Sequence, residues 1–528
     1  MAGPASFAAA VAEGLRQAGV HRLFGVPGGG ANLDLIEASA GLGIGFTLAH
    51  TESAACIMAS TFGRLTGTAG VAVVTRGPGL TSAANGLAQA TLDRSPLLLL
   101  VDGVPRAEAY RIVHQWLDQV RMAAPLAKHS GVLGWQEPST TVEAAAALAC
   151  RPPAGAVNLT LDRSVPGDRI EPASVTPQTA DPGDDVHAVL ARARRPVVIV
   201  GLDAVDAAGL IRPALSGIGC PVLTTYQAKG AVAESWDGYA GLFTGAAIEA
   251  ELLHQADLIV GLGLDPVEPV PGAWPYQADV VVLHRHPIEA GYFGARARTL
   301  IGEYGADLLP LLGHLRPSWP PGTGAKFRAA TQDALEDGAA GFRPQDVVRT
   351  IRETAGDVTV TVDAGAHMLV AMALWNTDHP SRVLISNGLA TMGFALPAAV
   401  GAALARPSSR VICLVGDGGL GMVLAELETL ARLDLDVTVV VFNDATLTLI
   451  ELKQRPGADP GAVAYCGTDF AAAARAMGVP AATATASGQL RDQLAGVPRG
   501  PFLVDARIDR SSYRHVLRAI RGGPATQP

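Results

Sequence analysis

The stretch RVICLVGDGG, residues 410–419, says more about the fold than any other part of the chain. Residues 410–415 predict a buried strand, because a continuous apolar run is typical of strands covered on both faces. The run ends in Gly-Asp-Gly-Gly, residues 416–419, and open parallel sheets bind ligands beyond such strand ends. We also predict a helix over about 422–433, whose N-terminal amides would point at the same place. Glycines and amides together favour a phosphate site, with Asp417 available to Mg²⁺.

A second pair of polar residues follows the next apolar run. Residues 437–442 predict another buried strand, and Asn443 and Asp444 come directly after it. The distance from Asp417 is 444 − 417 = 27 positions, close to the length of one strand–helix–strand unit. Two oxygen-bearing side chains would therefore arrive at neighbouring strand ends, which is how a hard cation beside a phosphate is held.

The rest of the chain repeats this alternation of strand and helix. Runs rich in Val, Ile and Leu alternate with stretches of helical spacing, such as the one that contains Ala55, Met58 and Phe62. This predicts α/β layers with mainly parallel sheets. The other candidate strands are 46–49, 71–75, 97–101, 196–200, 257–261, 279–283 and 358–362.

Two stretches, residues 164–186 and 315–324, carry neither helical nor strand periodicity and are rich in Pro and small polar residues. We interpret both as linkers. They divide the chain into blocks of 1–165, 185–315 and 325–528. The predicted fold class is α/β, with three doubly wound parallel-sheet domains.

Composition limits the kinds of partner. The 528 residues are 49% hydrophobic, enough for a large core without disulfides. A net charge of −9 and the absence of any run of five basic residues argue against nucleic acid or an anionic membrane as the main partner.

The cysteines and the apolar stretches indicate the cellular compartment. The five cysteines lack CxxC or CxxH spacing, which indicates reduced thiols and not zinc ligands. No apolar stretch reaches the ~20 residues of a bilayer span, so we predict a cytoplasmic protein outside the membrane.

The Gly-Asp-Gly motif and the Asn-Asp that follows it together resemble the cofactor signature of a known family. These are the thiamine diphosphate-dependent enzymes of the acetolactate synthase, benzoylformate decarboxylase and benzaldehyde lyase superfamily. The resemblance runs from the N-terminus to near residue 510 and is weak in the middle block. It implies a pyrimidine-binding, a middle and a diphosphate-binding domain. It also implies Mg²⁺ held by Asp417, Asp444 and the main-chain carbonyl of Thr446, where many relatives have Asn in place of Asp444.

Two more segments of the third block resemble parts of the family's cofactor site. In residues 389–399, Met392 resembles the side chain that wedges under the cofactor and bends it, which brings its amino group close to the thiazolium C2 proton. The backbone carbonyl of Ala390 would receive that amino group, and residues 362–367 resemble a diphosphate-holding segment. The cofactor-binding residues implied are Gly28, Gly365, Ala366, His367, Ala390, Met392, Gly416, Asp417, Gly418, Gly419, Asp444, Thr446 and Leu447.

Glu52 has a specific task in this resemblance. It follows the candidate strand 46–49 and is predicted to begin a helix. An acidic side chain is common at such a position without any catalytic role, because it interacts favourably with the helix dipole. The family's Glu hydrogen-bonds N1′ of the cofactor's pyrimidine and promotes the imino form that removes the C2 proton. In the family this Glu and the Mg²⁺ come from different subunits. The resemblance therefore implies at least a homodimer and favours a homotetramer.

Two glycine loops of the first block resemble the loops that face the substrate, with Gly28, Gly29 and Thr75 nearest to it. Benzoylformate decarboxylase has His in place of Thr75 and Ser in place of Gly29, and the His-His pair of pyruvate decarboxylase is missing as well. The loops are therefore more similar to those of acetolactate synthase and benzaldehyde lyase. A third segment implies that Gln115, or alternatively His114, reaches the substrate. The catalytic residues implied are Glu52, Gln115, Thr75 and Gly29.

The middle block departs from acetolactate synthase where that family binds FAD. The family has Arg-Phe-Asp-Asp after one strand and Ile-Asp-Ile-Asp after the next. This chain has Leu-Asp-Pro-Val-Glu-Pro from residue 264 and Leu-His-Arg-His-Pro from residue 283. The missing Arg and the presence of His284 and His286 disfavour FAD, and Gly-Leu-Gly at 261–263 is too weak a pattern for a dinucleotide site.

The resemblance implies an enzyme that decarboxylates a small 2-oxo acid and joins the product to a second carbonyl compound. A simple 2-oxo acid decarboxylase and a lyase acting on 2-hydroxy ketones stay open as alternatives, because they share the cofactor residues. An NAD-binding protein would need a glycine fingerprint after the first strand, and the run from Gly25 to Gly28 does not fit one. A regulator without catalysis is expected to have lost Glu52 or Asp417, and both are present.

Overall fold

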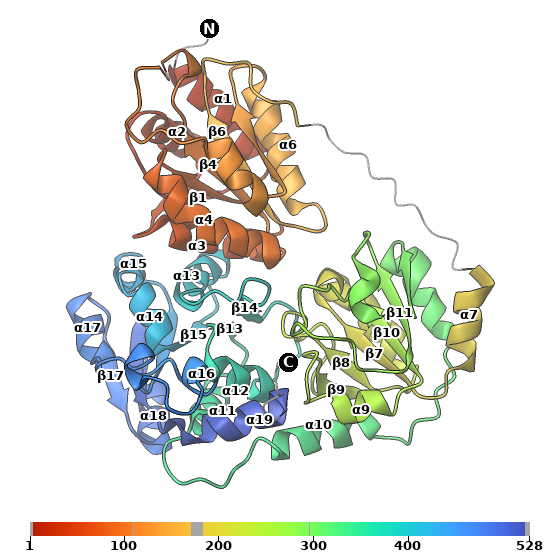
Figure 1. Cartoon of the computed structure of the whole chain (residues 1–528). Coiled ribbons are helices and arrows are strands. Elements are labelled where there is room, and N and C mark those ends of the chain that lie inside the picture. The colour runs from red at the N-terminus through yellow and green to blue at the C-terminus, as the bar shows by residue number, and fades with distance from the viewer. Residues whose placement is uncertain (1–3, 109, 171–182, 295, 523–528) are drawn as a thin grey trace.

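Three six-stranded parallel sheets, each flanked by helices, make up the chain (Figure 1). The computed structural model describes residues 4–108, 110–170, 183–294 and 296–522. In Figure 1 the first domain lies at the top, the third below it and the middle domain to the right. The α/β class with three parallel-sheet domains is confirmed. Part of the predicted linker 164–186 falls outside the described residues, and the block boundaries stay predictions.

The first and third sheets share one strand order. Numbered within its own domain, each runs 2-1-3-4-6-5 from edge to edge. The strands of the first sheet are β1 (Arg22–Val26), β2 (Gly45–Leu48), β3 (Gly70–Val74), β4 (Leu97–Asp102), β5 (His129–Leu133) and β6 (Ala156–Leu161). The strands of the third sheet are β13 (Thr359–Val362), β14 (Val383–Ile385), β15 (Val411–Gly416), β16 (Val437–Asn443), β17 (Ala481–Ala484) and β18 (Phe502–Arg507).

Helices connect these strands and cover the sheets. In the first domain they are α1 (Pro4–Gln17), α2 (Ala31–Ala40), α3 (Glu52–Thr66), α4 (Pro78–Leu92), α5 (Gln119–Ala123) and α6 (Pro138–Cys150). In the third domain they are α11 (Pro344–Ala355), α12 (Ala366–Leu374), α13 (Ala395–Ala405), α14 (Asp417–Met422), α15 (Glu426–Arg432), α16 (Thr448–Glu451), α17 (Phe470–Ala476), α18 (Ser487–Ala495) and α19 (Tyr513–Arg521).

The middle sheet has a different order, 3-2-1-4-5-6, which is that of dinucleotide-binding α/β domains. Its strands are β7 (Pro196–Val200), β8 (Val222–Thr224), β9 (Tyr239–Leu242), β10 (Leu258–Leu262), β11 (Asp279–His284) and β12 (Ala297–Ile301). Its helices are α7 (Gly183–Arg192), the 3₁₀ helix η3 (Leu202–Ala207), α8 (Ala208–Ser216), α9 (Ala250–His254) and α10 (Thr323–Asp333), which packs against β9. In the described part of the chain, no helix is both long and apolar enough to cross a membrane.

The apolar runs form strands because both of their faces are covered. Every residue of β16 is buried, as are the first five residues of β15. All the candidate strands occur, with ends within one residue of those predicted. The register pairs Gly416 with Phe442, so the residues that follow β15 and β16 emerge side by side.

The helix predicted over about 422–433 is wrong in its extent. Helix α14 begins at Asp417, directly at the strand end, and α15 begins only at Glu426. Val423 leaves the helical conformation, with φ −129° and ψ 22°. A Cβ on Gly419 would come closer than 3.0 Å to the Asp363 carboxylate, so only a glycine allows the chain to turn into a helix this early.

The first and third domains share one hydrophobic core. Helices α3 and α13 cross so closely that a Cβ on Gly401 would come within 3.0 Å of the Met58 carbonyl oxygen (Figure 1). Buried side chains from both domains form a joint cluster, in addition to a separate cluster in each. The middle domain has two clusters of its own and adds Tyr226 and Leu242 to the separate cluster of the third domain. The middle domain is tied to the first by Arg94, whose Nε lies 2.7 Å from Asp265 Oδ2.

Candidate functional site

A cavity of about 330 Å³ opens at the carboxyl ends of the strands of the third sheet. The loops after β13, β15 and β16 form it, together with the segment before α13. It is lined by all the cofactor-binding residues that the resemblance implies in the third block, namely Gly365, Ala366, His367, Ala390, Met392, Gly416, Asp417, Gly418, Gly419, Asp444, Thr446 and Leu447. The structure thus brings together residues spread over more than eighty positions, while their roles stay predictions.

The two carboxylates of the cavity differ in how they are satisfied. Asp417 Oδ1 accepts a hydrogen bond from the Gly418 amide at 2.7 Å, but Asp417 Oδ2 is buried and has no partner among the described residues. Asp444 accepts from the Thr446 amide at 3.1 Å and from Thr448 Oγ1 at 2.7 Å. Burial, with the nearby charge of Asp417, raises the pKa of Asp444 to about 6. A buried carboxylate oxygen without a partner is costly, and a cation would remove that cost.

The turn that carries Asp444 is strained. Ala445 has φ 57°, a left-handed conformation that costs a non-glycine residue about 1 kcal/mol or more. Thr446 Oγ1 contacts the Arg510 guanidinium, which holds the turn from outside the cavity. Ala390, which lines the cavity from the segment before α13, has φ 54°, so two segments around the cavity carry the same kind of strain. Strained residues of this kind cluster at functional sites, where the surrounding structure enforces them.

Asp363 is a positioning residue to which the sequence assigned no role. It follows β13, is fully buried, and accepts hydrogen bonds from the amides of Gly393 and Phe394, each at 3.0 Å. These bonds tie the segment that contains Met392 to the floor of the cavity. Met392 Cε lies 3.4 Å from where a Cβ of Gly418 would be, so its side chain covers the glycine loop. The only signal for Asp363 was an acid directly after a strand.

His367 supplies a second unsatisfied atom. Its ring stacks on Phe442 with centroids 5.2 Å apart, and Nε2 is buried without a partner among the described residues. Burial lowers the pKa of His367 to about 4, so the imidazole is neutral near pH 7. A neutral imidazole can donate one N–H to an anion. Lys453, Tyr513 and Arg521 also line the cavity, and no motif in the sequence pointed to them.

The candidate residues of the first domain form a separate group. A Cβ on Gly28 would come closer than 3.0 Å to Thr75 Oγ1, so these two loops touch, whereas a Cβ on Gly29 would meet nothing within 4 Å. Gln115 has φ 58°, and its backbone packs against Gly77. Glu52 is the first residue of α3. None of these residues lines the cavity of the third sheet within one chain.

Gln119 links the loops of this group, although the sequence suggested no role for it. Its Oε1 accepts from the Gly77 amide at 2.9 Å, and its Nε2 donates to the Asp102 carbonyl at 3.0 Å. Gln119 therefore joins the loop after β3 to the end of β4. The signal in the sequence was only its place close to Gln115.

At the strand ends of the middle sheet, the Leu202 amide and the carboxylate of Asp265 are paired within the protein. Glu268 accepts a hydrogen bond from the Leu202 amide at 2.9 Å and another from Thr225 Oγ1 at 2.5 Å, so the amide at the start of η3 is already occupied. Asp265 accepts two hydrogen bonds from Arg94, at 2.7 and 3.2 Å. In dinucleotide-binding domains the pyrophosphate occupies this first turn, so Glu268 stands where a phosphate would bind.

Comparisons with known proteins agree with this arrangement of domains. Residues 5–122 match the N-terminal thiamine pyrophosphate-binding domain of thiamine pyrophosphate enzymes, residues 184–309 match their central domain, and residues 363–506 match their C-terminal binding domain. The acetolactate synthase of Bacillus subtilis (strain 168) is 30% identical over 95% of this chain and 93% of its own length. The acetolactate synthase isozyme 3 large subunit of Escherichia coli (strain K12) is 30% identical over 84% of this chain and 83% of its own.

Proposed function

Because the chain belongs to the thiamine pyrophosphate enzymes of the acetolactate synthase superfamily, we propose that it decarboxylates a 2-oxo acid and joins the product to a second carbonyl compound. The observation that carries this proposal is the cavity of the third sheet. Among the described residues, it combines a buried carboxylate oxygen without a partner, a buried imidazole nitrogen without a partner and a floor of glycines. A Mg²⁺-bound diphosphate would provide a partner for each of these two atoms.

In this proposal the third domain holds the metal and the diphosphate. Asp417, Asp444 and the carbonyl of Thr446 would hold Mg²⁺, and the unpartnered Asp417 Oδ2 supports that assignment. His367 would donate a hydrogen bond to the diphosphate. The remaining implied cofactor residues, which line the same cavity, would contact the diphosphate or the thiazolium ring. These are Gly365, Ala366, Ala390, Met392, Gly416, Gly418, Gly419 and Leu447.

Thiamine diphosphate, when bound, supplies the electron sink that makes loss of CO₂ from a 2-oxo acid possible. Met392 would support the cofactor from beneath, and the carbonyl of Ala390 would accept a hydrogen bond from its amino group. Glu52 would hold a proton at the pyrimidine N1′ and shift the acid–base balance of that amino group. Thr75, Gly29 and Gln115 would shape the space for the second carbonyl compound. The structure supports this last point by packing Gln115 against the loop that carries Thr75.

We propose at least a homodimer, and a homotetramer as the favoured assembly. Glu52 does not line the cavity of its own chain, so a second chain would have to bring it there. Tyr110, Val113 and Trp116 are 83%, 74% and 50% exposed, next to Gln115. Large apolar side chains this exposed favour contact with another chain. A cytoplasmic location also stays a prediction.

We propose that the middle domain binds no FAD, despite its strand order. Two contacts support this proposal. Glu268 accepts a hydrogen bond from the amide of the first turn, and Arg94 forms an ion pair with Asp265. A flavin pyrophosphate would have to displace a buried, hydrogen-bonded carboxyl group. The purified protein should therefore lack yellow flavin absorbance, and stoichiometric FAD would overturn this part of the proposal.

The reaction is tested by CO₂ release, with product masses, from a panel of 2-oxo acids with thiamine diphosphate and Mg²⁺. Pyruvate should give CO₂ and acetolactate. An aldehyde as the only product would instead identify a simple decarboxylase. No release from any acid, together with cleavage of 2-hydroxy ketones, would identify a lyase of the benzaldehyde lyase type. The Asp417→Ala variant, assayed in parallel, should show only background release.

A further inference from the structure

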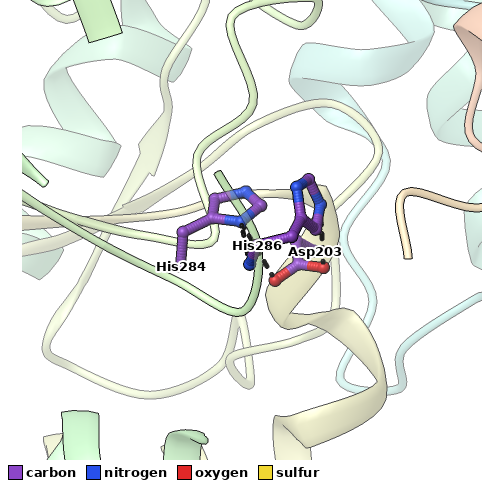
Figure 2. A group of neighbouring side chains, drawn as sticks. All are labelled: Asp203, His284 and His286. Carbon is purple, nitrogen blue, oxygen red and sulfur yellow. Dashed lines mark hydrogen bonds and ion pairs between the residues drawn. The ribbon is translucent and has the colours of Figure 1, made fainter. Parts of the chain in front are cut away.

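A second cluster of polar groups lies in the middle domain, away from the cavity of the third sheet. Asp203 stands at the start of η3, His284 ends β11, and His286 follows it (Figure 2). Asp203 Oδ2 lies 3.6 Å from His284 Nδ1, and Asp203 Oδ1 lies 3.7 Å from His286 Nε2. One ligand atom from each side chain lies within 4.8 Å of the others. The two segments are about eighty positions apart, and β10 lies between β7 and β11 in the sheet.

The backbone fixes the tautomer of each histidine. His286 Nδ1 lies 3.1 Å from the Pro287 carbonyl oxygen, which only accepts, so Nδ1 carries the proton and Nε2 a lone pair. The His286 amide points at His284 Nδ1 from 3.4 Å, which places a lone pair on that nitrogen as well. The lone pair of His286 Nε2 therefore faces the Asp203 carboxylate, whose Oδ2 also accepts a hydrogen bond from the Tyr304 hydroxyl at 2.9 Å. A cation between the three side chains would bind His286 Nε2 and would replace the long amide contact at His284 Nδ1. The contact of His286 Nδ1 to the backbone carbonyl is the second-nitrogen contact that is usual for metal-binding histidines.

Burial makes the position of His284 unusual. The His284 side chain has no exposed surface, and its Nε2 has no hydrogen-bond partner among the described residues. Its Nδ1, the nitrogen that faces Asp203 at 3.6 Å, has only the long contact from the His286 amide within the part of the chain that the structure describes. Buried polar nitrogens normally have a close partner, and a cation bound at Nδ1 would provide one for that nitrogen, while Nε2 lies outside the cluster. This observation is independent of the spacing of the three side chains.

Charged side chains surround the three candidate ligands. Arg285 already binds Asp203, with Nη2 3.0 Å from Oδ1 and Nε 3.2 Å from Oδ2. The same guanidinium lies 3.2 Å from Asp206 Oδ2. The arginines and aspartates that line the neighbouring cavity balance one another in number, so a cation would have to compete with Arg285 for Asp203. Arg285 can also turn toward Asp206, which is exposed, when a metal competes for Asp203.

We propose that Asp203, His284 and His286 bind a divalent transition-metal ion, with Zn²⁺ as the probe. Two imidazoles and one carboxylate suit zinc and its neighbours and do not suit Mg²⁺, which prefers oxygen ligands. Zinc ligands at 2.0–2.2 Å from the ion stand about 3.3–3.6 Å apart in a tetrahedron, close to the two distances seen here. Asp203 and His286 also line a cavity of about 250 Å³, which gives a fourth ligand such as water access to the ion.

The test is zinc binding to the holoenzyme. The protein is treated with chelator, returned to thiamine diphosphate and Mg²⁺, and equilibrated with Zn²⁺ in competition with a chromophoric chelator. Wild type should bind one Zn²⁺ per chain. His284→Ala and His286→Ala should each weaken binding by at least about 100-fold, the upper end of what loss of a mere supporting residue costs. His286 is partly exposed, so its variant guards against loss of the fold.

Two controls separate this site from others. His314→Ala removes a histidine of the same domain whose ring packs edge-on against His187, with centroids 4.6 Å apart, and it should leave zinc binding unchanged. Asp417→Ala should lose the cofactor but keep the zinc, so failure of the proposed function would not be mistaken for failure of this site. No zinc bound to wild type, or equal binding by wild type and both cluster variants, would overturn the proposal.

Discussion

The third sheet and the middle sheet differ in how the polar groups at their strand ends are paired. The third sheet, which shares the order 2-1-3-4-6-5 with the first, leaves Asp417 Oδ2 and His367 Nε2 buried without partners among the described residues, above a floor of glycines. The middle sheet has the order of a dinucleotide-binding domain. Yet Glu268 occupies its first turn, and Asp265 is paired with Arg94.

This difference shows why strand order alone does not predict a ligand. An unpaired buried carboxylate costs about 1–3 kcal/mol or more, so it persists where a ligand compensates for it. At the middle sheet the hydrogen-bonding capacity of the first turn is already used within the chain. What the sheet can bind depends on which atoms are left unsatisfied. By that criterion the third sheet suits a metal-bound diphosphate, and the middle sheet retains only the cluster around His284.

The largest expected effect is the loss of Asp417. Asp417→Ala removes the unpaired carboxylate, so Mg²⁺-dependent binding of thiamine diphosphate should be abolished in calorimetric titration. Asp492→Ala, an exposed acid of the same domain, is the matched control and should bind like wild type. Unchanged cofactor affinity of Asp417→Ala would contradict the contrast between the third and the middle sheet. The unpaired carboxylate oxygen would then have no role in binding a cation.

The next effect concerns the first domain. Glu52→Gln keeps the shape of the side chain but removes its acid–base function, so turnover should fall by about 10²–10⁴-fold while cofactor affinity is retained. Steady-state rates and binding titrations measure the two quantities separately. Glu37→Gln changes an exposed glutamate of the same domain and should not alter the rate. Near wild-type turnover of Glu52→Gln would remove Glu52 from the mechanism.

Two adjacent glycines provide a smaller, steric test of the outer sheets. Gly28→Ala places a Cβ against Thr75 Oγ1 and should destabilise the loop by about 1–3 kcal/mol, as overpacking typically does. Gly29→Ala meets nothing within 4 Å and should change stability by less than about 0.5 kcal/mol. Thermal unfolding of both variants measures the difference. Equal effects of the two variants would contradict the close approach of the two loops.

The smallest expected effect concerns Glu268, which accepts a hydrogen bond from the first turn after β7. Burial raises the pKa of Glu268 to about 8, from 4.5 in the unfolded chain. Between these values the folded chain keeps a proton that the unfolded chain releases. The stability from this group is therefore complete below pH 4.5 and is lost as the pH rises toward 8, by at most about 1.4 kcal/mol per pH unit.

Glu268→Gln cannot titrate, so the stability of wild type relative to this variant should fall as the pH rises from 5.5 to 7.5. Urea unfolding of both proteins at a series of pH values measures this difference. Glu251→Gln, which changes an exposed glutamate of the same domain, should follow wild type at every pH. A difference in unfolding free energy between wild type and Glu268→Gln that does not change with pH would contradict this prediction. Glu268 would then be ionised throughout, and burial would not keep its carboxyl group neutral.

Most of the third domain's cavity could be predicted because its residues stand next to strand ends in the sequence. Asp417 and Asp444 follow β15 and β16, and parallel pairing of neighbouring strands brings them to one edge. Asp363 was missed as a positioning residue, because its partners Gly393 and Phe394 lie thirty positions away. The early start of α14 at Asp417 was missed as well, because it depends on the close approach of Gly419 to Asp363 and not on local helical preference.

The strands, their alternation with helices and the glycine-acid loops can be predicted from the sequence, because continuous apolar runs and turn residues act over a few positions. Which polar atoms lack partners depends on the packing of the whole fold. In the sequence, His284 and His286 were interpreted only as residues that replace those of a flavin site. Nothing near them in the chain indicated that Asp203 lies beside them. The physical reason is that hydrogen-bond satisfaction depends on every group within about 3–4 Å, and packed sheets draw those groups from distant segments.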